Sequence, residues 1–504
     1  MKNSQGRAIG AVMIITVLCR VMSLVANQFY ISHFGAADVE LNIYSYAASM
    51  PNIIFNSLGT AISTVVIPIF ASLTAEGKNK RANLFVSNVI TVFGSIISLL
   101  VIGGMIISPY LPMLTEFKSG EQYDFAVKAL MIVMPVMLFY GLSYIFQGVL
   151  QSLGHFAFPA AVSLPSSLVI IGYVVLLADK YGVTGLLWAT VLGLFLQAAI
   201  LIPPAVKAGF RFKWTYDLKN PDLRQAFSLI LPVLLGSGAF QINMFYNVTL
   251  TANFPGTVTL LTFVQNLVLS TVLAVVYSAT AVLYPKMTKE LAVGNEEGYK
   301  KTLEGGINSF LFLFIPATFG IIAVRNEFLN LISGYGKVTQ DDIGVAGKIL
   351  ALYSIAFVSI ALKELLDRGF FAAKSTRIPA VCGFITVGAN VVFSQIGIKF
   401  LGVYAVPLAY SLSSFCAVGF LLVKMGKRLK GIWKSVIRVG AVSLVSSAVM
   451  FALLQVLTAY MPHFDGILGK IIGLAVPVLA GGALYALMSV LLRNPVAMKM
   501  LKRG

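Results

Sequence analysis

The sequence predicts an all-α polytopic membrane protein with about 14 transmembrane helices, and three observations lead to this fold class. Of the 504 residues, 58% are hydrophobic and only 11% are charged, and the mean hydropathy is +0.88. The apolar residues come in runs of about 20, which is the length that an α-helix needs to cross about 30 Å of hydrocarbon. Basic residues gather in every second loop. These features exclude ordinary soluble domains, outer-membrane barrels and nucleic-acid binders as primary interpretations.

The apolar runs place the spans in order along the chain. The predicted ranges are 8–32, 42–72, 83–108, 125–152, 159–178, 184–206, 223–251, 258–285, 302–324, 345–373, 378–399, 403–423, 438–460 and 468–492. The first run follows a short cationic lead without a small-residue cleavage site, which predicts a retained helix rather than a signal peptide. Cys19, Cys382 and Cys416 each lie inside a run, so we expect buried thiols and no disulfide.

The basic residues also predict the direction of the spans. An even number of spans puts both termini on one side of the membrane. With this count, most of the 37 Lys and Arg residues fall in the loops on the side of the termini. Because cytoplasmic loops are enriched in Lys and Arg, we expect the N- and C-termini to be cytoplasmic.

Short similar segments recur at an offset of about 217–221 residues, which indicates an internal repeat. The matching segments are 64–68 with 281–285, 155–160 with 375–380, and the glycines Gly182 and Gly402. The repeat unit is six spans, an even number, so the two copies share one orientation, as in transporters that work by alternating access. The predicted organisation is an N-lobe (1–206), a cytoplasmic linker (207–224), a C-lobe (225–425), and two further spans with a tail (426–504).

Arg20 is the most informative polar residue because it lies near the middle of the first span. A lone arginine at that depth costs about 2.5–3.5 kcal/mol unless it faces water, an anion or a carboxylate. No Asp or Glu occurs between Glu40 and Glu76 or between Arg224 and Lys286. We therefore expect Arg20 to bind a phosphate-like anion. The alternative is an arginine that snorkels or pairs with backbone carbonyls.

Amides accompany this arginine in the first two helices of each predicted lobe. The candidate substrate-binding residues, together with Arg20, are Asn27, Gln28, Asn52, Asn56, Asn243, Asn247 and Asn266. Such a set could line a hydrated site that hydrogen-bonds sugar hydroxyls and amides. The alternative for each residue alone is ordinary interhelical amide bonding.

A charged turn in the span 345–373 is the second candidate site. Lys363 and Asp367, and likewise Glu364 and Arg368, are four residues apart, so each pair can neutralise itself on one helix face. The turn is a candidate gate or ion-coupling site, and the alternative is a self-paired, partly solvated helix end. No cluster has metal-ligand spacing, and no catalytic constellation or cofactor motif occurs. The sequence therefore predicts no cofactor, no metal site and no catalytic residue.

Several motifs resemble those of the MurJ-type lipid II flippases, a family in the superfamily of MATE exporters and O-antigen flippases. They are Cys19-Arg20-Val21-Met22-Ser23, Phe34-Gly35-Ala36, Pro51-Asn52, residues 66–70, 284–287, 368–372 and 376–379. The resemblance implies two six-helix lobes and two last helices that help to shelter a lipid tail. It also implies movement of an undecaprenyl-diphosphate-linked precursor from the cytoplasmic to the outer leaflet of the bacterial plasma membrane.

The chain departs from this family in its arginines. Arg20 matches, but the second family arginine of the first span falls on Ala26. The basic pair after Pro-Asn falls on Phe55 and Asn56, and the arginine of the eighth span falls on Asn266. Fewer fixed charges would face a diphosphate, while Asn56 and Asn266 could keep hydrogen bonding at those places.

The predicted function is therefore that of a lipid II flippase and not of an enzyme. Its expected partners are a lipid-linked saccharide diphosphate, membrane lipids and cell-wall synthesis proteins, and not a nucleic acid. Alternatives are a flippase for another lipid-linked oligosaccharide, of the O-antigen or teichoic type, and a MATE-like cation-coupled exporter of small amphiphiles. A membrane glycosyltransferase would need catalytic carboxylates and a larger extramembrane loop. A non-transporting scaffold is a further alternative.

Overall fold

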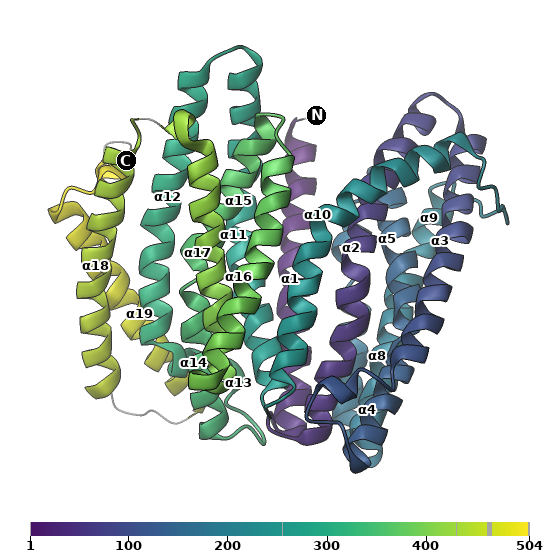
Figure 1. Cartoon of the computed structure of the whole chain (residues 1–504), viewed down its shortest axis with the longest axis horizontal. Coiled ribbons are helices and arrows are strands. Elements are labelled where there is room, and N and C mark those ends of the chain that lie inside the picture. Colours follow the sequence, from purple (N-terminus) through teal and green to yellow (C-terminus); the bar gives the residue numbers. More distant parts are fainter. Residues whose placement is uncertain (1, 255, 430, 461–465, 502–504) are drawn as a thin grey trace. The chain divides into compact units, whose positions relative to one another are not determined.

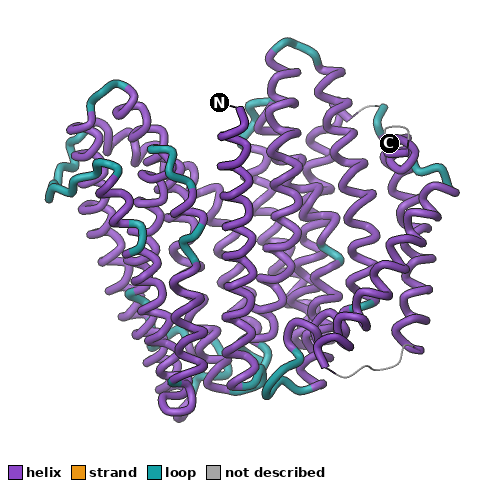
Figure 2. Tube along the Cα trace, turned by 180° about the vertical axis from the view of Figure 1, so that it is seen from behind, coloured by secondary structure: helices purple, strands orange, loops and turns teal. Residues whose placement is uncertain are grey.

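The computed structural model describes residues 2–254, 256–429, 431–460 and 466–501. Side chains are described for these residues except 2–13, 56–57, 60, 63–65, 229, 231–237 and 427. The described residues form helices and loops without a β-strand (Figure 2). They divide into two compact units, Met1–Thr259 and Leu260–Gly504.

The first unit is built around a long central helix, α2, on which α5, α4, α3 and α10 pack (Figure 1). Asp38 caps the start of α2, where its carboxylate accepts a hydrogen bond of 2.8 Å from the Leu41 amide. The helices of this unit are α1 (Lys2–Phe34), α2 (Val39–Ala75), α3 (Asn79–Ile107), α4 (Gly120–Val133), α5 (Val136–Ser152), α6 (Ala157–Ala160), α7 (Leu164–Leu176), α8 (Ala178–Ala199), α9 (Ile202–Lys207) and α10 (Pro221–Thr251), with a short 3₁₀ turn, η1 (Pro112–Leu114).

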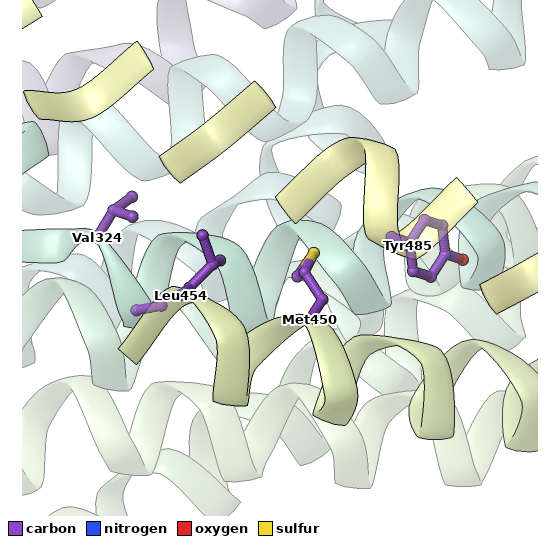
Figure 3. Close-up of a cluster of buried hydrophobic side chains, with 5 residues drawn as sticks. Val324, Met450, Leu454 and Tyr485 are labelled. Atoms are coloured by element: carbon purple, nitrogen blue, oxygen red, sulfur yellow. The ribbon is translucent and has the colours of Figure 1, made fainter. Parts of the chain in front are cut away.

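The second unit repeats this series and adds helices at its end. Its helices are α11 (Val258–Ala292), α12 (Glu296–Ala323), α13 (Arg325–Ser333), α14 (Gln340–Ser354), α15 (Phe357–Ala372), α16 (Arg377–Leu401), α17 (Ala405–Met425), α18 (Trp433–Tyr460), α19 (Gly466–Leu491) and α20 (Pro495–Leu501), with 3₁₀ turns η2 (Gly402–Tyr404) and η3 (Gly426–Leu429). The two added long helices, α18 and α19, pack on α12 around a buried cluster of Ala323, Val324, Met450, Leu454 and Tyr485 (Figure 3). The Tyr485 hydroxyl donates to the Phe312 carbonyl at 2.7 Å, which satisfies its polar end inside the cluster.

Helices cover each of the fourteen predicted ranges among the described residues, which confirms the fold class. Eleven helical stretches are long and apolar enough to cross a membrane. One of them, Arg377–Met425, contains both α16 and α17, and α2 and α10 occupy the predicted ranges 42–72 and 223–251. Pro135 separates α4 from α5, where a proline interrupts the backbone ladder of one predicted span.

The helix boundaries themselves recur, as the short sequence matches predict. Helices α2 and α11 end at Ala75 and Ala292, 217 residues apart, and α5 and α15 end at Ser152 and Ala372, 220 residues apart. Gly182 breaks α8 with φ 57° and ψ −153°, and Gly402 ends α16 with φ 56° and ψ −136°. Only glycine adopts this conformation without strain, so the same break is encoded by the same residue in both units.

Two details differ from what the sequence suggests. The first compact unit extends to Thr259 and therefore includes α10, which the sequence analysis assigns to the C-lobe; the lobe boundaries at 206 and 225 stay a prediction. Cys19 and Cys382 are buried, but the expectation was wrong for Cys416, which is exposed on α17. An exposed apolar residue is unremarkable on a helix of a membrane protein, because lipid tails solvate it as well as a protein core does.

Candidate functional site

Arg20 lies near the middle of α1, on the flank of the face by which this helix packs on α7. That packing face contains Cys19, Ser23 and Ala26, and the Ser23 hydroxyl lies 3.3 Å from that of Ser167. Arg20 is one position away from Cys19, so its side chain is exposed rather than buried against α7. It forms no ion pair with the side chains that the structure describes. The guanidinium is therefore accessible to a ligand or to lipid.

Asn27 and Gln28 follow two turns further along α1 and are half-buried. Asn27 is seven residues from Arg20, which places the two side chains on the same face of the helix. Gln28 is rotated by a further 100° or so and takes part in an interaction within the chain. The helix thus presents Arg20 and Asn27 together, as expected for parts of one polar stripe.

Asn52 of α2 is exposed, and its side chain shares a hydrogen bond with that of Tyr140 on α5. This tyrosine gave no signal in the sequence, because its pairing with Asn52 depends on the packing of two helices far apart in the chain. The next predicted residue, Asn56, belongs to α2, but its side chain lies outside the described residues.

The positions where the family carries further arginines are filled by packing in this chain. Ala26 is 2% exposed, and Phe55 is fully buried. The Phe55 ring stacks on Tyr140 and Tyr144 of α5, at centroid distances of 6.4 and 6.3 Å. Neither position could accept a guanidinium without repacking the interface of α2 and α5. The loss of charge at these positions is therefore built into the core of the unit.

Asn243 and Asn247 lie on one face of α10 and are buried, with 2% and 0% exposure. The Asn247 carbonyl accepts a hydrogen bond of 2.7 Å from the Thr251 hydroxyl. Both polar atoms of the Asn247 side chain, and Oδ1 of Asn243, have no hydrogen-bond partner among the described residues. Such a buried amide costs about 1–3 kcal/mol, so the pair would favour any polar group that binds it.

Asn266, the last predicted binding residue, belongs to the second unit. It is exposed on α11, next to the buried Gln265. The structure therefore brings Arg20, Asn27, Gln28, Asn52, Asn243 and Asn247 into the first unit and Asn266 into the second.

The charged turn of α15 pairs as its spacing predicts. Lys363 Nζ donates to Asp367 Oδ2 at 2.7 Å, and Arg368 Nε donates to Glu364 Oε1 at 2.8 Å. The Arg368 guanidinium also lies 5.9 Å from the centre of the Tyr284 ring. Asp367 is largely buried, and its second oxygen has no partner among the described residues. A gate or ion-coupling role for Lys363, Glu364, Asp367 and Arg368 stays a prediction.

An ion pair that the sequence did not indicate ties α3 to α10. Arg81 Nε and Nη2 donate to the two carboxylate oxygens of Asp222 at 2.8 and 2.9 Å, in a bidentate geometry. The pair borders a groove of about 390 Å³ that Pro68, Ser72 and Glu76 also line. Its partners are 141 residues apart, so no local spacing could reveal it.

Among the described residues, no group of three or more His, Cys, Asp or Glu side chains has the arrangement of a metal site. The polar features of the chain are instead one exposed cation, several amides and a self-paired charged turn. Such groups can bind an anionic, hydroxyl-rich ligand.

The comparisons with known proteins agree with this description. The family model "Lipid II flippase MurJ" matches residues 31–488. A probable lipid II flippase MurJ of Vibrio cholerae serotype O1 is 23% identical over 433 residues, which are 83% of this chain and 82% of that protein. One of Borreliella burgdorferi is 24% identical over 425 residues, with 83% of each chain covered.

The fold is similar to that of solved transporters. A MurJ flippase in an inward closed conformation matches with a TM-score of 0.79 at 22% identity, over 96% of this chain and 99% of that one. An inward-facing MATE family multidrug transporter matches with a TM-score of 0.65 at 15% identity, over 84% and 99%. Since the family model covers most of its length, the chain belongs to the MurJ lipid II flippase family.

Proposed function

We propose that this protein is a flippase that moves an undecaprenyl-diphosphate-linked cell-wall precursor, lipid II, across the bacterial plasma membrane by alternating access. Membership of the MurJ family and the fold shared with MATE transporters support this proposal. The precursor crosses without covalent change, so the protein acts as a transporter and not as a catalyst. The N- and C-termini are cytoplasmic, in agreement with the distribution of Lys and Arg.

The observation that carries the proposal is the exposed guanidinium of Arg20 at mid-depth in α1. Its planar fork suits two phosphate oxygens, and it has no acidic partner among the described residues that would neutralise it. Asn27 on the same face, with the amides of Asn52, Asn243 and Asn247, would hydrogen-bond the sugar and peptide part of the precursor. Lys363, Glu364, Asp367 and Arg368 would act as a gate or coupling site.

A cation-coupled exporter of small amphiphiles is the second candidate, because the fold is shared with MATE transporters. That function needs an acidic residue in the binding site to hold a cation. The ranges 41–75 and 225–285 contain no Asp or Glu, which favours an anionic substrate. Flipping of another lipid-linked oligosaccharide would use the same phosphate contact. Cell-wall synthesis proteins that supply or consume the precursor are the expected protein partners.

The experiment is transport of a lipid-linked diphosphate saccharide in proteoliposomes, together with surface labelling of the precursor in depleted cells. We expect depletion to trap the precursor in the inner leaflet. Arg20→Ala should lower the transport rate about 10- to 100-fold, since a charge-assisted hydrogen bond is worth about 1.5–3 kcal/mol. Arg20→Lys should recover part of the rate, because it keeps the charge and loses the fork.

Arg224→Ala is the matched control, because Arg224 is exposed at the start of α10. It should transport like the wild type. Wild-type transport by Arg20→Ala would remove the phosphate role of Arg20. Normal export of the precursor in depleted cells would overturn the flippase function itself.

A further inference from the structure

The segment between α9 and α10, residues 208–220, has a surface that the transport mechanism does not use. It contains neither helix nor strand over residues 210–217 and runs beside α3, as a loop of the first unit (Figure 2). The sequence there is Arg211-Phe212-Lys213-Trp214-Thr215-Tyr216-Asp217-Leu218-Lys219. Aromatic or apolar residues occupy every second position, and basic residues lie between and beside them.

The backbone of this segment is fixed to α3 by side chains of the helix. Asn83 donates to the Gly209 carbonyl at 3.2 Å, and the Lys213 amide donates to the Ser87 hydroxyl at 3.1 Å. Asn88 forms a reciprocal pair with Asp217, in which its amide donates to the carbonyl at 2.7 Å and its Oδ1 accepts from the amide at 2.9 Å. The segment is therefore held in one place on the helix.

A buried ring secures its beginning. Phe210 is 2% exposed and packs edge to face on Phe146 of α5, at a centroid distance of 5.8 Å. The hydrogen bonds to α3 use the backbone of Gly209, Lys213 and Asp217, all at odd-numbered positions. The apolar side chains stand at the even-numbered positions between these anchors.

Those apolar side chains are exposed. Phe212 is 50% exposed, Trp214 76%, Tyr216 56% and Leu218 53%. The rings of Phe212 and Trp214 contact each other edge to face at 6.4 Å, so they form one apolar surface. A fixed row of four such side chains in water would be unfavourable, which indicates an apolar environment around it.

The depth of the anchors identifies that environment. Ser87 and Asn88 lie eight and nine residues after the first residue of α3, Asn79, and this helix is long and apolar enough to span the membrane. At 1.5 Å per residue the anchors lie about 12–14 Å along its axis. The segment is thus beside the end of a membrane helix and not in the solution beyond it. Trp and Tyr prefer this interfacial level.

The charge of the segment indicates which lipids surround it. Arg211, Lys213 and Lys219 are exposed, against a single exposed acid, Asp217. Basic residues next to interfacial aromatic side chains attract anionic headgroups. We propose that residues 211–219 form an interfacial anchor, which inserts Phe212, Trp214, Tyr216 and Leu218 into an anionic phospholipid leaflet. The anchor is independent of the substrate that the protein carries.

The first test uses the fluorescence of Trp214 in the full-length protein in lipid nanodiscs. The other two tryptophans, Trp188 and Trp433, are 58% and 41% exposed, so Trp188→Phe and Trp433→Phe remove their signals with little loss of packing. We expect blue-shifted emission that lipids brominated near the glycerol quench more strongly than lipids brominated near the chain end. Acrylamide in solution should quench it weakly.

Red-shifted emission that acrylamide quenches and brominated lipids do not would overturn the anchor. It would mean that the segment faces water or is a docking surface for a soluble protein. The background variant without phenylalanine substitution at Trp214 should be compared with Trp214→Phe, which must abolish the quenched signal and so assigns it.

The second test addresses the lipid class. In nanodiscs of phosphatidylglycerol, the Trp214 emission should be more blue-shifted than in phosphatidylcholine. The variant Arg211→Gln/Lys213→Gln/Lys219→Gln should lose this difference. The control Lys286→Gln/Lys289→Gln/Lys301→Gln removes three charges from the loop after α11 and should keep it. Equal wild-type emission in both lipids would overturn the preference for anionic headgroups.

Discussion

The two compact units repeat one backbone plan but distribute their charges differently. Both break a helix at a glycine with φ near 57°, at Gly182 and Gly402. In the first unit the mid-helix cation Arg20 is exposed and has no described acidic partner. In the second unit the cations of α15 are paired with acids one turn away. Backbone geometry is thus maintained by residues that only glycine can replace, whereas charge is free to differ between the copies.

The same contrast appears in equivalent helices. The turn of α15 that holds Lys363 and Asp367 corresponds, 220 residues earlier, to Ser143 and Gln147 of α5. There, α5 is packed on α2 through the aromatic stack of Phe55, Tyr140 and Tyr144 instead. One copy of the helix is therefore held by aromatic packing, and the other carries self-neutralised charges.

The largest effect is expected from Phe55→Ala, which would remove the aromatic stack of the first unit. Phe55 is fully buried, so truncation should lower the free energy of unfolding by about 3–5 kcal/mol. Thermal unfolding of the purified protein in detergent measures the loss. Phe400→Ala, at a position that is 80% exposed, is the control and should change the midpoint little. Equal midpoints for the two variants would show that the stack does not hold α2 to α5.

The paired turn of the second unit should respond next. Lys363→Met or Asp367→Asn alone leaves one charged partner uncompensated and should cost about 1.5–3 kcal/mol. The double variant should cost less than the sum of the two, since neither charge is then left alone. A double-mutant cycle of thermal stability measures this coupling. Additive losses would mean that the pair does not stabilise the helix, and unchanged transport by the double variant would remove its role as a gate.

Alanine at the two helix breaks tests the repeat directly. Gly182→Ala and Gly402→Ala should each cost about 1–3 kcal/mol, because both residues have a positive φ that an L side chain resists. Gly94→Ala is the control: Gly94 lies within α3 with open space for a methyl group and should be neutral or stabilising. A loss at only one of the two glycines would contradict the equivalence of the breaks.

The smallest effect concerns pH at the end of α2. The Lys78 ammonium donates to Glu76 at 2.6 Å and holds the pKa of that carboxyl below its usual value. A lowered pKa stabilises the fold above the unfolded value, about 4.3, and the gain is lost as the pH falls through the folded value. Glu76 is fully exposed, so the unfolding midpoint should shift only slightly. Lys78→Gln should abolish the difference between wild type and Glu76→Gln at pH 6, and a difference that persists would exclude this pair as its cause.

The sequence by itself determined the features that depend on neighbours along the chain. The length of each apolar run was sufficient to place the helices, because a span must cross a fixed thickness of hydrocarbon. The pairs on α15 followed from their four-residue spacing, and the repeat followed from residues such as Gly182 and Gly402. Candidate binding residues could be named because polar groups are rare in such helices.

Only the tertiary structure decided which of those polar groups are accessible. Arg20 is exposed while Asn247 is buried, although both lie in apolar helices. The pair of Arg81 with Asp222 and that of Asn88 with Asp217 join residues 141 and 129 apart. The physical reason is that helix formation in a membrane is driven by local hydrophobicity, whereas exposure and long-range pairing depend on which faces pack together, and no periodicity in the chain records that choice.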